Sequence, residues 1–406
     1  MPDPLPQTRA ACAAWDAADP AAGFRDRFVI PDETLVYLDG NSLGRLPRAT
    51  VHRLAHVVTE EWGRGLVVSW DGWIDDAARV GDLIGTSFLG AIPGETLLAD
   101  STTVNLYKLV SAACAERPGA VVVAPDEFPT DRYVAEAVAA AQGRRLAGSL
   151  AEFTGEVAVV VRSAVDYRSG ALVDLAAETE RAHERGALML WDCSHAVGAV
   201  PLQLRAAGAD LAVGCTYKHL CGGPGAPAWI WVRSELQADL DQPIHGWFGQ
   251  REQFAMEAAW SPRSGVGSWL SGTPPVLALA AVEEGARLVA EVGIAHVAAR
   301  SRRLGDLLIA RFDAVLAQLG CTLASPREAS LRGAHVAVRH AAAGPVALAL
   351  RERGVVPDVR PPDVIRIGLS ALTTRATDVW DGIEALADVL RGGAWQAHVR
   401  TTSRVT

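Results

Sequence analysis

The sequence lacks any long apolar run. No stretch of its 406 residues approaches the roughly 20 apolar residues that a membrane-spanning helix needs. The first residues, Met1-Pro2-Asp3-Pro4, also lack the basic start and the apolar stretch of a secretory signal. We therefore expect a cytoplasmic protein without a membrane partner.

Clustered positive charge is also lacking. The formal net charge is −9, and the arginines are spread along the chain without a basic block. Because nucleic acids and anionic membranes attract basic patches, this distribution argues against both as main partners. A small-molecule ligand is the better expectation.

Cysteine pairs at metal-site spacing are absent. The six cysteines form no C-x-x-C pair and have no clustered histidines; they stand at positions 12, 114, 193, 215, 221 and 321. This spacing predicts reduced thiols and no metal site.

Short β-branched runs alternate with helical patterns between about residues 46 and 280. Such alternation is typical of βαβ units, so it predicts an α/β fold with a mostly parallel sheet covered by helices on both faces. The strand-like runs cover residues 121–123, 157–161, 188–191 and 211–213, and the helical patterns cover 49–64, 131–142, 175–185 and 276–290.

The pattern changes near residue 282. A long helical stretch at 295–319 is followed by a strand-like 334–338, a helix at 345–353 and a strand at 364–367. We expect three parts: an N-terminal segment, 1–45, that packs on the small domain; a large domain, 46–285; and a smaller α+β C-terminal domain, 286–406.

Asp192 and Lys218 each follow a predicted strand. Ligands bind at the carboxyl ends of strands in open α/β sheets. There Asp192 could hold a pyridinium nitrogen protonated, and Lys218 could form a Schiff base, as pyridoxal phosphate requires. Glycines at 222, 223 and 225 would let the backbone pass close to such a cofactor.

Each of these residues also has an ordinary interpretation. An aspartate after a strand is most often a turn or cap residue, and a single lysine is most often a solvated charge. The two together with the glycine-rich turn favour the cofactor. That turn lacks the Lys-Ser/Thr ending of a P-loop and the G-x-G-x-x-G order, so it does not indicate a nucleotide site.

Asp100-Ser101-Thr102-Thr103 follows the strand-like residues 96–99 and opens a helix. Hydroxyls and free backbone N–H groups at a helix start suit a phosphate. Alone, the segment would be interpreted as a helix cap. With a cofactor lysine elsewhere, phosphate binding becomes the better interpretation.

With these residues in view, the chain resembles the kynureninase family of fold-type-I pyridoxal-phosphate enzymes, which are related to the class V aminotransferases. The resemblance covers about residues 37–370 and implies a large domain with a seven-stranded sheet. It rests on segments in family order: Tyr37-Leu38-Asp39-Gly40-Asn41-Ser42-Leu43-Gly44, Phe128-Pro129-Thr130-Asp131, residues 191–227, Gly246-Trp247-Phe248-Gly249 and Ser271-Gly272-Thr273-Pro274-Pro275.

The resemblance implies a role for each matching residue. Lys218 would be the Schiff-base lysine, Asp192 the pyridinium partner supported by His195, and Tyr217 a helper in proton transfer. Arg366 is similar to the arginine that binds the substrate carboxylate. Further cofactor contacts are implied for Phe128, which would stack on the ring, for Thr102, Thr103, Tyr217 and Trp247 around the phosphate, for Thr273 across a dimer interface, and for Asp131 and Ser163.

The implied activity is hydrolysis of the Cβ–Cγ bond of L-kynurenine, of 3-hydroxykynurenine or of another ring-substituted analogue. The products would be anthranilate, or its analogue, and L-alanine, in tryptophan degradation through the kynurenine pathway; a catabolic role and a role in NAD biosynthesis both remain open. The resemblance also implies a homodimer with the active site at its interface.

One segment departs from the family. After Arg366 the family usually continues through a Pro-Leu-Tyr segment, whereas this chain continues Gly368-Leu369-Ser370-Ala371-Leu372-Thr373. The departure leaves the aromatic group of the substrate and the wall of its pocket undefined.

Two alternatives remain. A cysteine desulfurase or lyase on the same fold would need a nucleophilic cysteine, for which Cys321 is the candidate. A non-catalytic cofactor-binding regulator is disfavoured because Lys218 and Arg366 are both present and the termini are too short for a helix-turn-helix domain.

Overall fold

The strand-like runs of the first 280 residues form one central sheet in the computed structural model, which describes residues 4–399 and 401. Its seven strands lie in the order β2-β8-β7-β6-β5-β3-β4, and β8 runs antiparallel to both of its neighbours while the remaining pairs are parallel. The predicted seven-stranded, mostly parallel sheet is therefore confirmed. The strands are β2 (Thr96–Ala99), β3 (Ala120–Val123), β4 (Leu146–Ala147), β5 (Val157–Ser163), β6 (Leu188–Asp192), β7 (Leu211–Gly214) and β8 (Ala228–Val232).

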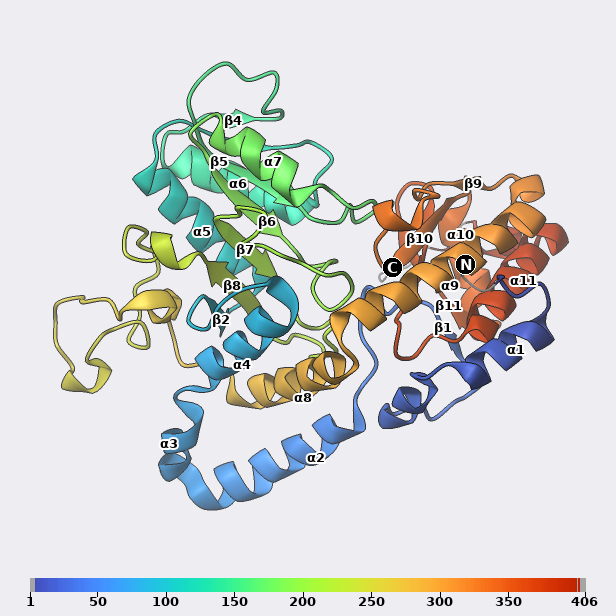
Figure 1. The fold of residues 1–406 in the computed structure, drawn as a ribbon, viewed down its shortest axis with the longest axis horizontal. Coiled ribbons are helices and arrows are strands. Elements are labelled where there is room, and N and C mark those ends of the chain that lie inside the picture. The colour runs from blue at the N-terminus through green and yellow to red at the C-terminus, as the bar shows by residue number, and fades with distance from the viewer. Residues whose placement is uncertain (1–3, 400, 402–406) are drawn as a thin grey trace.

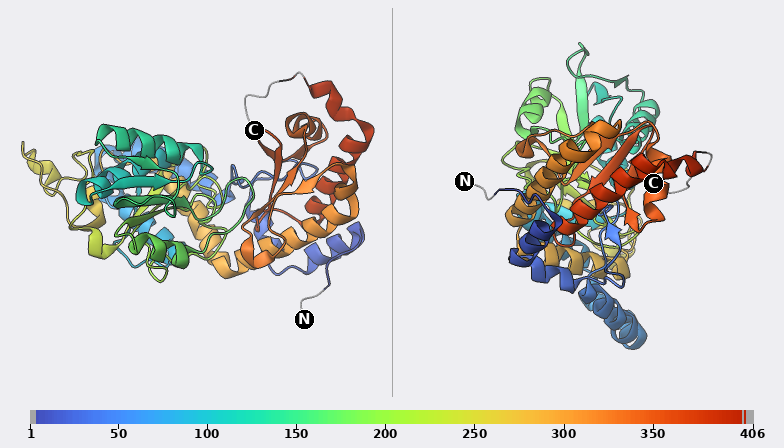
Figure 2. Two further views of the ribbon diagram at one scale, coloured as in Figure 1. Left: turned by 90° about the horizontal axis from the view of Figure 1, so that it is seen from above. Right: turned by 90° about the vertical axis from the view of Figure 1, so that its right-hand side faces the viewer.

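Helices cover both faces of this sheet. In Figure 2, α6 in teal and α7 in green lie on opposite sides of the strands. Because the strands are buried on both faces, nearly all of their residues are apolar. The surrounding helices are α2 (Arg48–His56), α3 (Trp70–Trp73), α4 (Asp76–Ile84), α5 (Thr102–Glu116), α6 (Pro129–Ala141), α7 (Leu175–His183) and α8 (Val276–Val292).

A second body is built around a four-stranded antiparallel sheet of order β12-β13-β10-β9. Figure 1 shows α9 running from α8 into this body. The strands are β9 (Thr322–Leu323), β10 (His335–Arg339), β12 (Asp358–Arg360) and β13 (Val364–Gly368), and the helices are α9 (Ile294–Arg311), α10 (Ala343–Arg351) and α11 (Ala376–Gly392). It has its own apolar core, separate from that of the large sheet.

The beginning of the chain lies against the second body. β1 (Val36–Tyr37) pairs in parallel with β11 (Val355–Val356). Helix α1 (Arg9–Ala18) packs on α11, where Asp16 accepts hydrogen bonds from the backbone N–H groups of Ala376 and Thr377. The segment after β1 then crosses to the large domain. The Leu38 carbonyl accepts a hydrogen bond from Gly368 in the second body, and the Gly44 N–H donates to the Tyr217 carbonyl at the site described next.

Among the described residues, no helix has both the length and the apolar content needed to cross a membrane.

Candidate active site

Asp192 and Lys218 lie at the same edge of the large sheet. β6 ends at Asp192, which is paired in register with Val213 of the neighbouring β7, and Lys218 follows the end of β7 by four residues. Both strands are parallel, so their carboxyl ends meet where open α/β sheets bind ligands. The structure thus brings together two side chains that are 26 positions apart.

His195 joins them. The Nζ atom of Lys218 lies 3.0 Å from Nε2 of His195. Burial lowers the pKa of Lys218, and burial together with the charges of Lys218 and Arg366 lowers the pKa of His195 well below its ordinary value. A neutral imidazole therefore faces the amine, and a larger share of Lys218 is unprotonated than for a lysine in water.

Asp131 and Ser163 lie beside Asp192. Ser163 is the register partner of Asp192 on β5, and its backbone N–H donates to Glu127 (3.1 Å). Burial raises the pKa of Asp131 well above its ordinary value, and the nearby charges of Asp192 and Glu127 raise it further. Among the residues the structure describes, neither carboxylate oxygen of Asp131 has a hydrogen-bond partner. Asp192 accepts one hydrogen bond, from the backbone N–H of Ser194 (2.7 Å), so the cluster has room for a further donor such as a protonated ring nitrogen.

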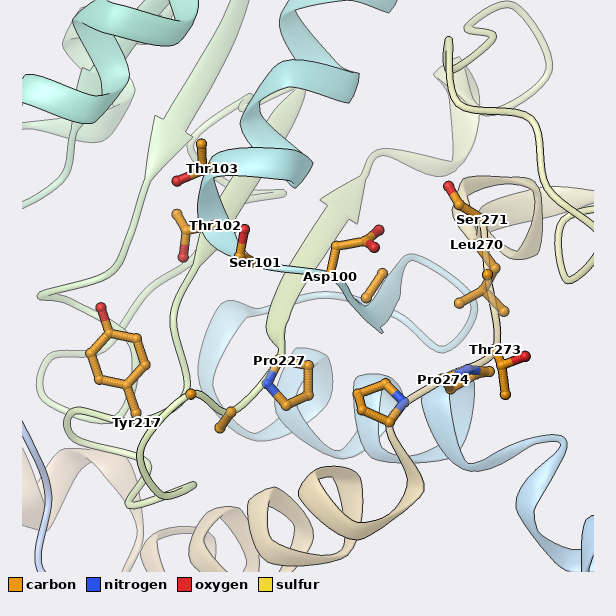
Figure 3. A pocket seen from close by; sticks show the side chains of 15 residues that line it. Asp100, Ser101, Thr102, Thr103, Tyr217, Pro227, Leu270, Ser271, Thr273 and Pro274 are labelled. Carbon is orange, nitrogen blue, oxygen red and sulfur yellow. The ribbon is translucent and has the colours of Figure 1, made fainter.

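Thr102 and Thr103 open α5 and line a cavity of about 480 Å³. Tyr217 and Thr273 line the same cavity, and Figure 3 shows the Thr102, Thr103 and Tyr217 side chains on one side and Thr273 across from them. The start of the 15-residue helix α5 lines this space, and a helix N-terminus suits an anion. The neighbouring Cys215 and burial raise the pKa of Tyr217, which keeps its phenol protonated as a hydrogen-bond donor.

Phe128 and Trp247 are the most exposed of the aromatic residues predicted to contact the cofactor. Phe128 precedes α6, is 36% exposed and packs edge-to-face on Tyr167 with 5.3 Å between ring centroids. Trp247 is 43% exposed, contacts Phe248 and Phe254, and is not among the residues lining the cavity of Thr102 and Thr103. Within one subunit the structure therefore does not bring Trp247 to the predicted phosphate position.

Arg366 reaches the site from β13 and is fully buried. Its Nε donates to Asp358 (2.5 Å) and its Nη1 donates to the carbonyl of Tyr167 (2.6 Å). The same Nη1 lies 3.5 Å from Nε2 of His195. These hydrogen bonds fix the guanidinium beside His195 and Lys218. Its Nε side is occupied by Asp358.

Arg366 contacts three residues that had no predicted role: Asp358, Tyr167 through its carbonyl, and Ser42. Ser42 accepts a hydrogen bond from Nη2 of Arg366 (3.2 Å), and it belongs to the Leu38–Gly44 string that carried the resemblance. Gly44, two residues further along the chain, passes close to the backbone of Lys218. A Cβ there would lie 2.3 Å from the Lys218 carbonyl oxygen, so only glycine fits. Asp358 and Tyr167 gave no signal, because nothing in their local sequence distinguishes them.

Comparison with solved structures shows which fold the chain has. It matches an apo cysteine desulfurase from Thermococcus onnurineus with a TM-score of 0.78 at 14% identity, over 91% of this chain and 98% of that chain. A cysteine desulfurase from Escherichia coli matches with a TM-score of 0.78 at 17% identity, over 92% of this chain and 99% of that chain. The fold is that of the fold-type-I pyridoxal-phosphate enzymes, as predicted.

Relatives in sequence show the family to which the chain belongs. The chain is 41% identical to a kynureninase from Pseudomonas fluorescens, over 98% of this chain and all of the relative. It is 38% identical to a kynureninase from Burkholderia pseudomallei, over 96% and 97% of the two chains. The kynureninase C-terminal domain family matches residues 297–386. The chain belongs to the kynureninase family, which confirms the predicted family, its hydrolase class and its cofactor, pyridoxal phosphate.

Proposed function

We propose that the chain hydrolyses the Cβ–Cγ bond of L-kynurenine, or of a ring-substituted analogue, to anthranilate or its analogue and L-alanine. The observation that carries this proposal is the contact chain Lys218–His195–Arg366, which sets a cofactor lysine beside an arginine suited to an α-carboxylate. Membership of the kynureninase family supports the reaction.

Three features fit the cofactor. Lys218 would hold the cofactor covalently through its aldehyde carbon. Asp192, with the unpartnered carboxylate of Asp131 beside it, would accept a hydrogen bond from the ring N–H. The start of α5 and Tyr217 would bind the phosphate. When bound, pyridoxal phosphate supplies an electron sink next to the amino nitrogen of the substrate.

The residues of the chain divide the remaining work. Arg366 would orient the substrate through its carboxylate, because Asp358, Tyr167 and Ser42 fix the guanidinium. Lys218 would remove the α-proton of the bound substrate, because its lowered pKa favours the neutral amine that can act as a base. Tyr217 would donate a proton to the departing alanine fragment, because its phenol remains protonated.

The proposal is tested by mixing the purified holoenzyme with L-kynurenine, 3-hydroxykynurenine and further ring-substituted analogues. We expect anthranilate-type fluorescence and alanine to appear in equal amounts. The substrate with the highest kcat/KM would identify the ring that the segment after Arg366 accepts. Absence of cleavage of every analogue by a protein that carries its cofactor would contradict the proposal.

A cysteine desulfurase activity is disfavoured by the cysteines. Cys321 is 4% exposed in the core of the second body, and burial raises its pKa to about 11. A desulfurase needs an accessible, ionisable thiol. Cys221 is partly exposed, but burial raises its pKa to about 12, so it does not meet this requirement either. We expect no sulfide when cysteine is added.

We further propose a homodimer with the active site at its interface. Two segments carry large apolar side chains that are more than half exposed: Trp62, Leu66, Val67 and Val68 in one, and Phe254 and Met256 in the other. Trp70, two residues after the first segment, packs on Phe248, six residues before the second, with 5.8 Å between ring centroids. Exposed apolar side chains of this kind are typical of an interface between subunits. Trp247, which contacts Phe254, and Thr273 are both exposed and could serve a partner.

We also propose that the protein works in the cytoplasm. All six cysteines are free thiols in the structure, which suits a reducing compartment. An unchanged thiol titration of protein purified with and without reductant would support this location.

A further inference from the structure

Lysine is rare in this chain. Of its 38 lysines and arginines only two are lysines, Lys108 and Lys218. Even fully buried cationic positions, such as Arg332 and Arg366, are occupied by arginine. A lysine at position 108 therefore indicates a place where a compact ammonium with three tetrahedral donors is needed and a planar guanidinium does not serve.

Lys108 is fully buried on α5 and joins two distant segments. Its Nζ donates to Oδ2 of Asp100 (2.6 Å) and to the backbone carbonyl of Trp269 (2.8 Å). Asp100 directly precedes the N-cap residue of α5, and Trp269 directly precedes residues 270–275. These segments form two walls of the cavity of Thr102 and Thr103, so a single ammonium ties the walls together.

Asp100 needs this support. Its φ of +44° lies in the left-handed region, which is costly for a residue other than glycine. Its carbonyl accepts a hydrogen bond from the N–H of Ala228 (2.9 Å) at the start of β8. In Figure 3 the Asp100 side chain points away from Thr102 and toward Leu270 and Ser271. The conformation of Asp100 therefore sets the direction in which α5 begins.

The charge of Asp100 adds a second requirement. Asp100 lines the cavity and its side chain is 32% exposed, so an unpaired carboxylate there would repel a phosphate dianion. The buried ammonium of Lys108 pairs with this carboxylate and compensates its negative charge. Burial lowers the pKa of Lys108, while the hydrogen bond and charge of Asp100 oppose that effect.

We propose that Lys108 is a positioning residue for the phosphate of the cofactor. It holds Asp100 and the Trp269 backbone together so that the start of α5 and residues 270–275 form one preorganised anion cavity. It touches neither the aldehyde nor the ring, and so its effect is specific to the phosphate. This inference rests on the proposed function in one respect, the binding of the cofactor phosphate in this cavity.

The test compares pyridoxal phosphate with pyridoxal, which has the same ring and aldehyde but no phosphate. Apo-protein is titrated with each while the imine absorbance is followed. For Lys108→Met we expect the affinity for pyridoxal phosphate to fall by about tenfold to a hundredfold, the range for loss of a charged hydrogen bond, with the affinity for pyridoxal unchanged. An equal loss for both compounds, or no loss for either, would overturn the proposal.

Two further variants control for folding. Arg332→Met removes a buried cation that pairs with Asp306 in the second body, away from the cavity, and should leave both affinities unchanged. The double variant Lys108→Met/Asp100→Asn has no unpaired carboxylate, so it should bind pyridoxal phosphate more tightly than Lys108→Met and less tightly than the wild type. It serves as the test if Lys108→Met does not fold, and wild-type affinity in it would then overturn the proposal.

The outcomes separate the two claims. A wild-type apo-protein that binds no pyridoxal phosphate contradicts the proposed function. A wild-type protein that binds it, together with a folded Lys108→Met variant of equal affinity, contradicts only the role of Lys108.

Discussion

Nε2 of His195 lies 3.0 Å from Nζ of Lys218 and 3.5 Å from Nη1 of Arg366. One neutral imidazole thus separates the lysine that would bind the cofactor from the arginine that would bind the substrate carboxylate. Both cations lower the pKa of His195 in addition to the effect of burial. The imidazole therefore stays neutral, and its Nε2 can accept a hydrogen bond from either cation without adding a third positive charge.

The lowered pKa of Lys218 predicts the pH dependence of cofactor binding. Only the neutral amine attacks an aldehyde, so the rate should rise with pH and level off above the pKa of Lys218. Because burial lowers that pKa, half of the maximal rate should be reached below the ordinary lysine value of about 10.4. The measurement is stopped-flow absorbance of apo-protein mixed with pyridoxal phosphate across pH, and a midpoint at the ordinary value would contradict the prediction.

Arg366→Lys should impair substrate use without loosening the cofactor. Lysine keeps the charge but loses the planar fork, so we expect kcat/KM to fall by about a hundredfold or more. Arg366 does not line the phosphate cavity, so the affinity for pyridoxal phosphate should stay at the wild-type value. Steady-state kinetics and a cofactor titration measure the two quantities; wild-type kcat/KM would exclude carboxylate binding by Arg366.

Asp131→Asn should stabilise the apo-protein and weaken cofactor binding. The native pKa of Asp131 is raised, so ionisation of this carboxyl costs native stability once the pH exceeds the unfolded value of about 3.9. The gain in unfolding free energy, about 1 kcal/mol for relief of a buried charge, should be absent in acid and grow as the pH rises. Urea unfolding at several pH values measures it, and a variant less stable than the wild type at neutral pH would refute it.

Subunit mixing tests the shared site. Lys218→Ala and Trp247→Ala subunits should each form dimers of low activity. If Trp247 serves the partner, a mixed dimer contains one site with both residues intact, and random pairing should restore about a quarter of the wild-type activity. Activity no greater than the sum of the parents would place Trp247 within its own subunit or outside the site.

The regular elements near the site could be predicted because their signals are local. The apolar run of β6, Leu-Met-Leu-Trp before Asp192, and the helix that opens at Thr102 both follow from side-chain pattern and capping. Strand β8 was not predicted: its residues Ala-Trp-Ile-Trp-Val follow the glycine-rich turn directly, and its antiparallel direction depends on pairing with β2 and β7. Helices α1, α4 and α11 were not predicted either.

Contacts between distant residues could not be derived from local pattern. His195 and Arg366 are 171 positions apart, and the sequence analysis linked them only through the family resemblance. Asp358 could not be identified, because a single aspartate gives no sign of being fully buried behind an arginine. Lys108 sits within a helix and in the sequence resembles a surface lysine; its burial depends on tertiary contacts, among them the hydrogen bond to the backbone carbonyl of Trp269.

The rarity of lysine makes the central claim directly measurable. Borohydride reduces the imine between a lysine and pyridoxal phosphate to a stable secondary amine, and only Lys108 and Lys218 offer side-chain amines. Reduction of the holoenzyme, proteolysis and mass spectrometry should locate one pyridoxyl group on the peptide that contains Lys218, with Lys108 unmodified. A pyridoxyl group on Lys108, or none on Lys218, would contradict the account.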